Sequence, residues 1–165
     1  MTNREFYLYH VGAELPRFLG VIQAAPADQL DYRPHGMCRT ARELIGHLVA
    51  HNQDAIELAQ TGKINHRTMA SFQTLDEAIQ LYRTTTATLE QEVAGMSDAT
   101  WESPGQFIIN GVVKYEYPRR DLAWLLFFDS VHHRGQLSSY LRPMGAKVPA
   151  IYGPSADTMM AAAQG

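Results

Sequence analysis

The stretch FDSVHHRGQLSSYLRPMG, residues 128–145, places two adjacent histidines inside an otherwise amphipathic helix that ends at Pro143. Asp129 lies four residues before His133, so their side chains lie one above the other on the same face of the helix. His132 is about 100° around the helix from His133 and therefore points to a different side. Because buried polar groups are costly unless they are paired, Asp129 and His133 predict a polar site on the inner face of this helix.

Four segments of about 20 residues carry apolar side chains at helical spacing. They predict long helices at residues 3–24, 41–60, 75–94 and 119–141. Two of these helices begin with the Thr-x-x-Glu pattern of a capping box: Thr40 with Glu43, and Thr74 with Glu77. Pro16 lies inside the first helix and is expected to kink or divide it.

Two shorter features lie outside the long helices. Residues 107–118, FIINGVVKYEYP, predict a short extended piece or a hairpin around Asn110 and Gly111. A short extra helix is expected from Asp157 onward. Since no repeat or linker divides the chain, the sequence predicts one all-α domain over residues 1–165, an up-down four-helix bundle with a short extra C-terminal helix.

The composition is that of an ordinary globular protein, with 45% hydrophobic and 19% charged residues among 165. A net charge of −3 with scattered basic residues argues against nucleic-acid binding. Cys38 is the single cysteine, so an intramolecular disulfide is excluded. The longest apolar run, residues 122–128, falls far short of the roughly 20 residues that span a bilayer, and the first residues do not resemble a secretory signal. A cytoplasmic protein without membrane contacts is expected.

The second predicted helix carries another pair of polar residues on its apolar stripe. His47 and His51 are four residues apart and share the stripe with several leucines. Two helices thus each offer a pair of metal-competent groups, which suit zinc, iron(II), nickel or manganese, in the kind of bundle interior where such sites form. The alternative reading is a set of buried histidines satisfied by hydrogen bonds, in which Asp129 simply pairs with His133.

Three segments of the chain form a recognisable set: RPHGMCRTARELIGHL at 33–48, HHRGQLSSYLRPMG at 132–145 and VPAIYGPSAD at 148–157. They resemble the DinB/YfiT-like family of metal-dependent four-helix-bundle proteins, and the histidine followed by Arg-Gly-Gln is the most specific motif among them. The resemblance implies a homodimer with a divalent metal held by three histidines. It places the first ligand at His47 and the last at His133, while the middle position falls on Asp129, where the family more often has histidine. Two histidines and one carboxylate also suit non-haem iron(II), which leaves the metal open.

Relatives in this family include transferases and isomerases that use low-molecular-weight thiols such as bacillithiol or mycothiol. The resemblance therefore implies a metal-dependent transferase, isomerase or hydrolase acting on a small molecule, with a thiol as a partner. His51 is interpreted as the catalytic, proton-transferring neighbour, although a fourth ligand or a second layer around the metal are alternative roles. Two other hypotheses stay open: a non-catalytic or stress-related dimer with a structural metal, and a degenerate site without metal.

The remaining polar residues receive structural interpretations. Arg134 is expected to pair with an acidic residue, the alternative being an anionic substrate, and Gly135 is expected to allow close helix packing. Tyr152 and Arg142 are expected either to line a pocket mouth or to serve packing. Four further residues are given no site role: His10, His35, His66 and Cys38.

Overall fold

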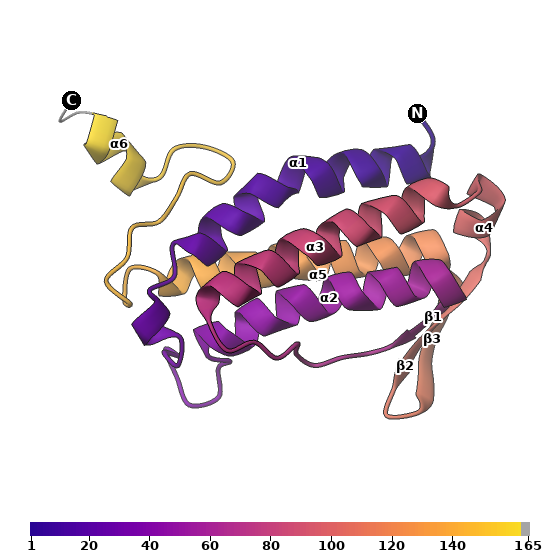
Figure 1. The fold of residues 1–165 in the computed structure, drawn as a ribbon, viewed down its shortest axis with the longest axis horizontal. Coiled ribbons are helices and arrows are strands. Elements are labelled where there is room, and N and C mark those ends of the chain that lie inside the picture. The colour runs from indigo at the N-terminus through magenta and orange to yellow at the C-terminus, as the bar shows by residue number, and fades with distance from the viewer. Residues whose placement is uncertain (163–165) are drawn as a thin grey trace.

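The computed structural model describes residues 1–162 and is mostly helical (Figure 1). Its four long helices are α1 (Asn3–Gln23), α2 (Ala41–Thr61), α3 (Leu75–Gly95) and α5 (Arg119–Tyr140). Helix α2 packs against α3 and α5, and α1 packs against the same two helices. Three short helices complete the set: η1 (Ala27–Gln29), α4 (Asp98–Glu102) and α6 (Ala156–Ala162). The last three residues of the predicted domain, 163–165, lie outside the described residues.

A small sheet lies at one end of the long helices, opposite the end that carries α6 (Figure 1). Its strands are β1 (Lys63–Asn65), β2 (Pro104–Ile109) and β3 (Val112–Pro118), in the order β1-β2-β3. Strand β1 is parallel to β2, and β2 is antiparallel to β3. Asn110 and Gly111 both have positive φ, which is what a tight hairpin turn requires. The hairpin prediction is confirmed, and the all-α assignment is wrong to the extent of this sheet.

The capping pattern fixes the start of α2 as predicted. Thr40 Oγ1 accepts a hydrogen bond from the Glu43 N–H, and Glu43 Oε2 accepts one from the Thr40 N–H at 2.7 Å. At α3, Thr74 Oγ1 accepts from the Glu77 N–H, but the Glu77 carboxylate binds the N–H of Gln73 at 2.7 Å. The second predicted capping box is therefore only half formed, because the glutamate reaches one residue further back.

Two expectations about single residues in α1 and α5 are corrected, namely that Pro16 divides α1 and that Gly135 marks close helix packing. Pro16 does not divide α1, which continues from Asn3 to Gln23. Gly135 does not mark the close helix packing that the sequence predicts, because a Cβ added there would meet nothing within 4 Å among the described residues. Gly62, in contrast, ends α2 with a left-handed φ of 77°, as its position predicts. Within residues 1–162, no helix combines the length and the apolarity that crossing a membrane takes.

Two apolar clusters fill the interior, one toward each end of the long helices. Helix α2 contributes Leu44 and Leu48 to the first cluster and Ala55 and Leu58 to the second. Helix α5 is divided in the same way, with Leu137 in the first and Leu126 in the second. A layer of buried polar side chains lies along α2 and α5 between the clusters: His47, His51, Ser130 and Arg134. Such a layer is costly unless its members are paired, so its contacts define the candidate site.

Candidate metal centre

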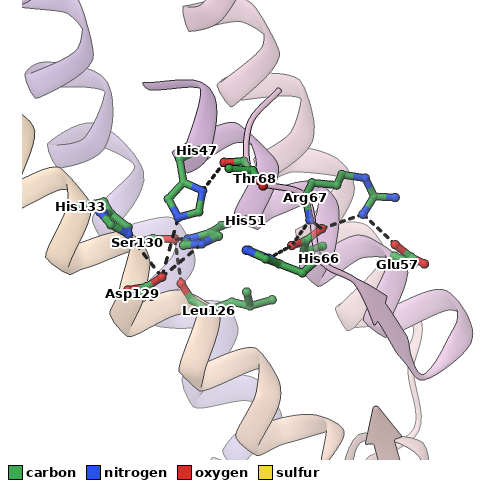
Figure 2. A network of polar contacts seen from close by, with 11 residues as sticks. His47, His51, Glu57, His66, Arg67, Thr68, Leu126, Asp129, Ser130 and His133 are labelled. Carbon is green, nitrogen blue, oxygen red and sulfur yellow. Dashed lines mark hydrogen bonds and ion pairs between the residues drawn. The ribbon is translucent and has the colours of Figure 1, made fainter. Parts of the chain in front are cut away.

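Two helices bring three imidazoles around one carboxylate (Figure 2). Asp129 Oδ2 lies 3.3 Å from His51 Nε2, 3.5 Å from His133 Nε2 and 4.0 Å from His47 Nε2. Ligand atoms of His47, His51 and Asp129 all lie within 4.8 Å of one another. The four residues that the sequence singles out therefore lie together, and His51 is at least as close to Asp129 as His133 is.

The second nitrogen of two of these rings is held by an oxygen that can only accept. His47 Nδ1 lies 2.6 Å from the carbonyl oxygen of Thr68, and His133 Nδ1 lies 2.8 Å from Oε1 of Gln136. Because a carbonyl oxygen has no proton to give, Nδ1 carries the hydrogen in both rings. The neutral form of each ring then presents the lone pair of Nε2 toward Asp129.

His51 is held in the same tautomer through a hydroxyl. Ser130 Oγ donates its hydrogen to the carbonyl oxygen of Leu126 at 2.8 Å, so it accepts from His51 Nδ1 at 3.0 Å. Partners that hold the far nitrogen of an imidazole are typical of metal-binding histidines, because they fix both tautomer and ring orientation.

The result is a set of donor atoms without a positive charge at its centre. Three Nε2 lone pairs and one carboxylate oxygen face the same point, and their mutual repulsion is relieved by a cation. Nitrogen and oxygen donors in this ratio suit a divalent transition metal, so the residues present fit such an ion. The Asp129 side chain is 45% exposed, whereas those of His47 and His51 are 3% and 2% exposed, so the site is reached from solvent at the carboxylate.

Burial and the carboxylate shift the pKa values of these groups in opposite directions. Burial lowers the pKa of His47 to about 4 and that of His51 to about 3. The hydrogen bond from His133 lowers the pKa of Asp129 to about 2, and the same contact raises the pKa of His133. In the metal-free protein, the Asp129 carboxylate therefore favours a proton on His133 over a proton on His47 or His51.

Comparison with known proteins identifies the family of this chain. The family model of the DinB family matches residues 1–164. The chain belongs to the DinB family. No functionally curated protein matches it.

Solved structures show that the fold of this DinB-family chain recurs. A DinB-like protein from Bacillus cereus is similar with a TM-score of 0.73 at 17% identity, covering 90% of this chain and 97% of that one. A DinB-like protein from Bacillus subtilis has a TM-score of 0.70 at 17% identity, covering 90% and 99%. A mycothiol-dependent maleylpyruvate isomerase has a TM-score of 0.53 at 14% identity, covering 87% of this chain and 61% of that one.

The pKa shifts predict how the metal-free DinB-family protein titrates. In a histidine NMR titration we expect His47 and His51 to stay neutral until well below pH 5 and His133 to protonate above its ordinary pKa of 6.5. Because the folded pKa values of His47 and His51 lie below those of the unfolded chain, their contribution to stability is present above about pH 6.5 and is lost as the pH falls toward 4. His133 has the opposite effect, because its pKa is raised in the folded protein: its contribution to stability is present below about pH 6.5 and is lost as the pH rises above that value. Midpoints near 6.5 for all three rings would contradict the described burial.

A crossing segment delivers the carbonyl that holds His47. Residues 67–70 lie against α2 at Gly46, whose carbonyl oxygen accepts a hydrogen bond from the Ala70 N–H at 2.9 Å. A Cβ at Gly46 would lie 2.6 Å from the Ala70 carbonyl oxygen and would also collide with Met69. Glycine at this position therefore allows the close approach that brings the Thr68 carbonyl to His47.

Gly46→Ala is expected to lower the free energy of unfolding by about 1–3 kcal/mol and to weaken metal binding, because the segment carrying Thr68 must move away from α2. Gly135→Ala is the matched control. Its position on α5 is open, so helix propensity should raise stability by about 0.5–1 kcal/mol and leave metal affinity unchanged. Urea unfolding and metal titration measure both effects. Equal behaviour of the two variants would show that Gly46 has no role in close packing.

A second polar network adjoins the histidines, and sequence reasoning missed it. Asp54 on α2 is fully buried and accepts hydrogen bonds from His66 Nδ1 at 2.9 Å and from Arg67 Nη1 at 2.7 Å. Burial raises the pKa of Asp54 despite these donors. Arg67 also binds Glu57 at 2.7 Å. The structure thus pairs Asp54 with His66 and Arg67, whereas the Nδ1 of His51 is held by Ser130.

His66 lies close to the site although the sequence assigns it no role there. Its ring centroid is 6.0 Å from that of His47 and 6.3 Å from that of His51, and Figure 2 shows it beside His51. The His66 backbone N–H donates to the Ile108 carbonyl oxygen, which ties the residue to β2. Strand β1 is only three residues long, so no alternating pattern in the sequence revealed this placement.

The expectations for the neighbours of the motif are tested by the fold of α5. His132 is exposed, which agrees with a helical phase different from that of His133. Arg134 is buried and its guanidinium pairs with the carboxylate of Glu14, which confirms the acidic partner. Tyr152 is exposed, and its hydroxyl accepts a hydrogen bond from Arg134 at 2.7 Å and donates one to Glu14 at 3.1 Å, so it adds to the Arg134–Glu14 pair.

The other candidates lie away from the site. Arg142 pairs with Asp157 at 2.9 Å. His10 packs against the ring of Phe6, and His35 accepts a hydrogen bond from a backbone N–H of its own loop. Cys38 is a free, half-buried thiol.

Proposed function

We propose that this protein is a metal-dependent enzyme that acts on a small molecule with a thiol as its partner. His47, Asp129 and His133 would hold a divalent transition metal, and His51 would move a proton beside it. One observation supports this best: three Nε2 lone pairs, each fixed by a partner on Nδ1, converge on a carboxylate that is reached from solvent. A catalytic metal site keeps such an open position, whereas a structural one is closed by protein.

The chemistry follows from the donor set and its surroundings. A bound metal ion lowers the pKa of a thiol or water and keeps it as thiolate or hydroxide near neutral pH. Thr68 and Gln136 orient the imidazoles of His47 and His133. Ser130 orients His51 so that its free nitrogen faces the site and accepts a proton there.

A thiol is the partner we propose because a structurally similar protein is a mycothiol-dependent isomerase. The likeness itself supports only the fold, so thiol dependence is a hypothesis for this chain. Among metals, two imidazoles and a carboxylate suit iron(II) as well as zinc, nickel and manganese.

The decisive experiment is metal analysis of protein purified without an affinity tag, before and after reconstitution with zinc, nickel, iron(II) and manganese. We expect one ion per chain and, by X-ray absorption spectroscopy, a coordination position filled by water. Addition of 2-mercaptoethanol should replace that water with sulfur. Protein that takes up none of the four metals would contradict the proposal.

A non-catalytic site is the second candidate, because His51 Nε2 lies as close to Asp129 as a fourth ligand would. Four protein ligands would close the site and make the ion a clamp between α2 and α5. His51→Ala separates the two proposals. An enzyme site keeps its stoichiometric metal in this variant, while a closed structural site loses it.

We further propose that the chain forms one domain, its four long helices an up-down bundle, and that it works as a cytoplasmic homodimer. Exposed apolar side chains on α1 and α5 support an interface between copies: Phe6, Tyr9, Leu125 and Phe128. Light scattering should give twice the mass of the chain, and Phe128→Glu should reduce it to that of the monomer.

A further inference from the structure

Arg39 is a half-buried arginine beside the metal centre that lacks a partner for its charge. It comes just before Thr40, the residue that caps α2, and its carbonyl oxygen accepts a hydrogen bond from the Tyr140 hydroxyl at 3.2 Å. Among residues 1–162, its guanidinium takes part in no ion pair and donates no hydrogen bond to protein. Nearby arginines differ: Arg42 pairs with Asp31 at 3.5 Å.

A surface groove places Arg39 next to the site. Its lining consists of Arg39, Glu43, Arg67, Thr68 and Met69. Thr68 belongs to this lining, and its carbonyl holds His47 Nδ1 at 2.6 Å. The two other charged residues of the groove are engaged, since Arg67 binds carboxylates and Glu43 accepts the Thr40 N–H at 2.7 Å. Arg39 is therefore the charged residue of this groove whose side chain has no partner among the described residues.

The charge of Arg39 also bears on what the site can bind. Arg39 shares its groove with Thr68, whose carbonyl holds His47. A guanidinium near these imidazoles repels a divalent cation between them. Such an arrangement weakens the site unless the bound molecule brings negative charge.

We propose that Arg39 binds a carboxylate group of the small molecule whose other end enters the metal centre. The proposal rests on the proposed function and deepens it, because it assigns the substrate or thiol partner to the class of small carboxylic acids. A planar guanidinium matches a carboxylate with two parallel hydrogen bonds, which gives both affinity and orientation.

Small thiols that share the HS–CH2–CH2 unit and differ in charge test this assignment on the cobalt(II)-loaded full-length protein. The probes are 3-mercaptopropionate, 2-mercaptoethanol and cysteamine, which carry a negative, no and a positive charge. Binding is read from the sulfur-to-cobalt charge-transfer band. We expect 3-mercaptopropionate to bind about tenfold tighter than 2-mercaptoethanol, and cysteamine to bind most weakly. For each protein we take the ratio of the dissociation constants of two thiols. Comparing this ratio between wild type and variant removes the intrinsic differences in cobalt(II) affinity among the thiols.

Arg39→Gln should reduce this preference to within about twofold, while cobalt(II) itself binds equally well or more tightly because a repulsive charge is gone. Arg33→Gln changes an exposed arginine of the same loop and should keep the preference. A preference that survives in Arg39→Gln, or that is absent from the wild type, would overturn the proposal. Loss of cobalt(II) from Arg39→Gln would also overturn it, because it would indicate a structural role.

Failure of the proposed function has a different signature, since none of the thiols would then give the charge-transfer band. In that case glutarate replaces the thiols, and calorimetry measures its binding to the full-length protein as isolated. Glutarate that binds the wild type about tenfold more tightly than Arg39→Gln supports the role of Arg39. Equal binding by the two proteins overturns it.

Discussion

Asp129→Asn is expected to weaken metal binding by about a hundredfold to a thousandfold. Structural zinc sites with four ligands bind with roughly 10–16 kcal/mol, so one ligand contributes roughly a quarter of this and its loss costs two to three powers of ten, as an order-of-magnitude estimate. The amide keeps the shape of the carboxylate and lacks its charge. Competition with a chromophoric chelator measures the loss.

The same variant should behave differently without metal. In alkaline buffer, where the imidazoles are neutral, the side-chain amide that this change introduces can donate hydrogen to the lone pairs that Asp129 repels, 3.3 Å away on His51 and 3.5 Å away on His133. Metal-free Asp129→Asn is therefore expected to unfold at the same or a higher urea concentration than the wild type. His132→Ala is the control and should keep its metal, because His132 is exposed. Equal metal loss in both variants would contradict the described helical phase.

Glu14→Ala is expected to lower the free energy of unfolding by about 3–5 kcal/mol, because it leaves the Arg134 guanidinium buried without its counter-charge. The Arg134 side chain is 2% exposed and that of Glu14 is 8% exposed. The guanidinium also lies over the ring of Phe18, with 4.7 Å between its carbon and the ring centroid. Urea unfolding monitored by circular dichroism gives the difference.

An exposed ion pair provides the comparison for this prediction. Arg142→Ala removes a partner of Asp157 at the surface, where such pairs contribute about 0–1 kcal/mol. The double variant Glu14→Leu with Arg134→Met replaces the buried pair by apolar side chains and should recover most of the loss. If Glu14→Ala cost no more than Arg142→Ala, the buried pair would not be the connection between α1 and α5 that the structure describes.

The four long helices could be predicted from sequence because apolar side chains recur along each of them at helical spacing, and in some of them local signals also mark an end. Helix α2 is the clearest case, since Thr40 and Glu43 begin it and Gly62 ends it. The small sheet could be predicted from the sequence only in part. Its hairpin has a distinctive turn at Asn110 and Gly111, whereas β1 is too short to show a pattern. The prediction for Gly135 is wrong because helical glycine has no local sign that separates an open position from a close contact.

The candidate site could also be predicted only in part. Helical spacing shows which side chains of one helix point to the same side, and only residues related in this way were identified. The spacing placed His47 with His51 and Asp129 with His133, and the structure brings the two pairs together. Residues that reach the site from other segments were missed. Thr68 contributes only its carbonyl, which any residue has, and His66 arrives through a three-residue strand. The position of Thr68 depends on close packing at Gly46 and that of His66 on its hydrogen bond to β2, and no local pattern in the sequence reveals either.

With the proposed metal bound, the polar layer between the two apolar clusters would link the lifetime of the folded chain to metal supply. The donors come from α2 and α5, and the unfolded chain cannot assemble them, so the ion would stabilise only the folded state. At a free metal concentration of about 100 times the dissociation constant, this adds about 2.7 kcal/mol to the free energy of unfolding. A cell that lacks the metal would hold more of this protein in the open forms that proteases degrade. Abundance would then follow metal availability without any dedicated regulator.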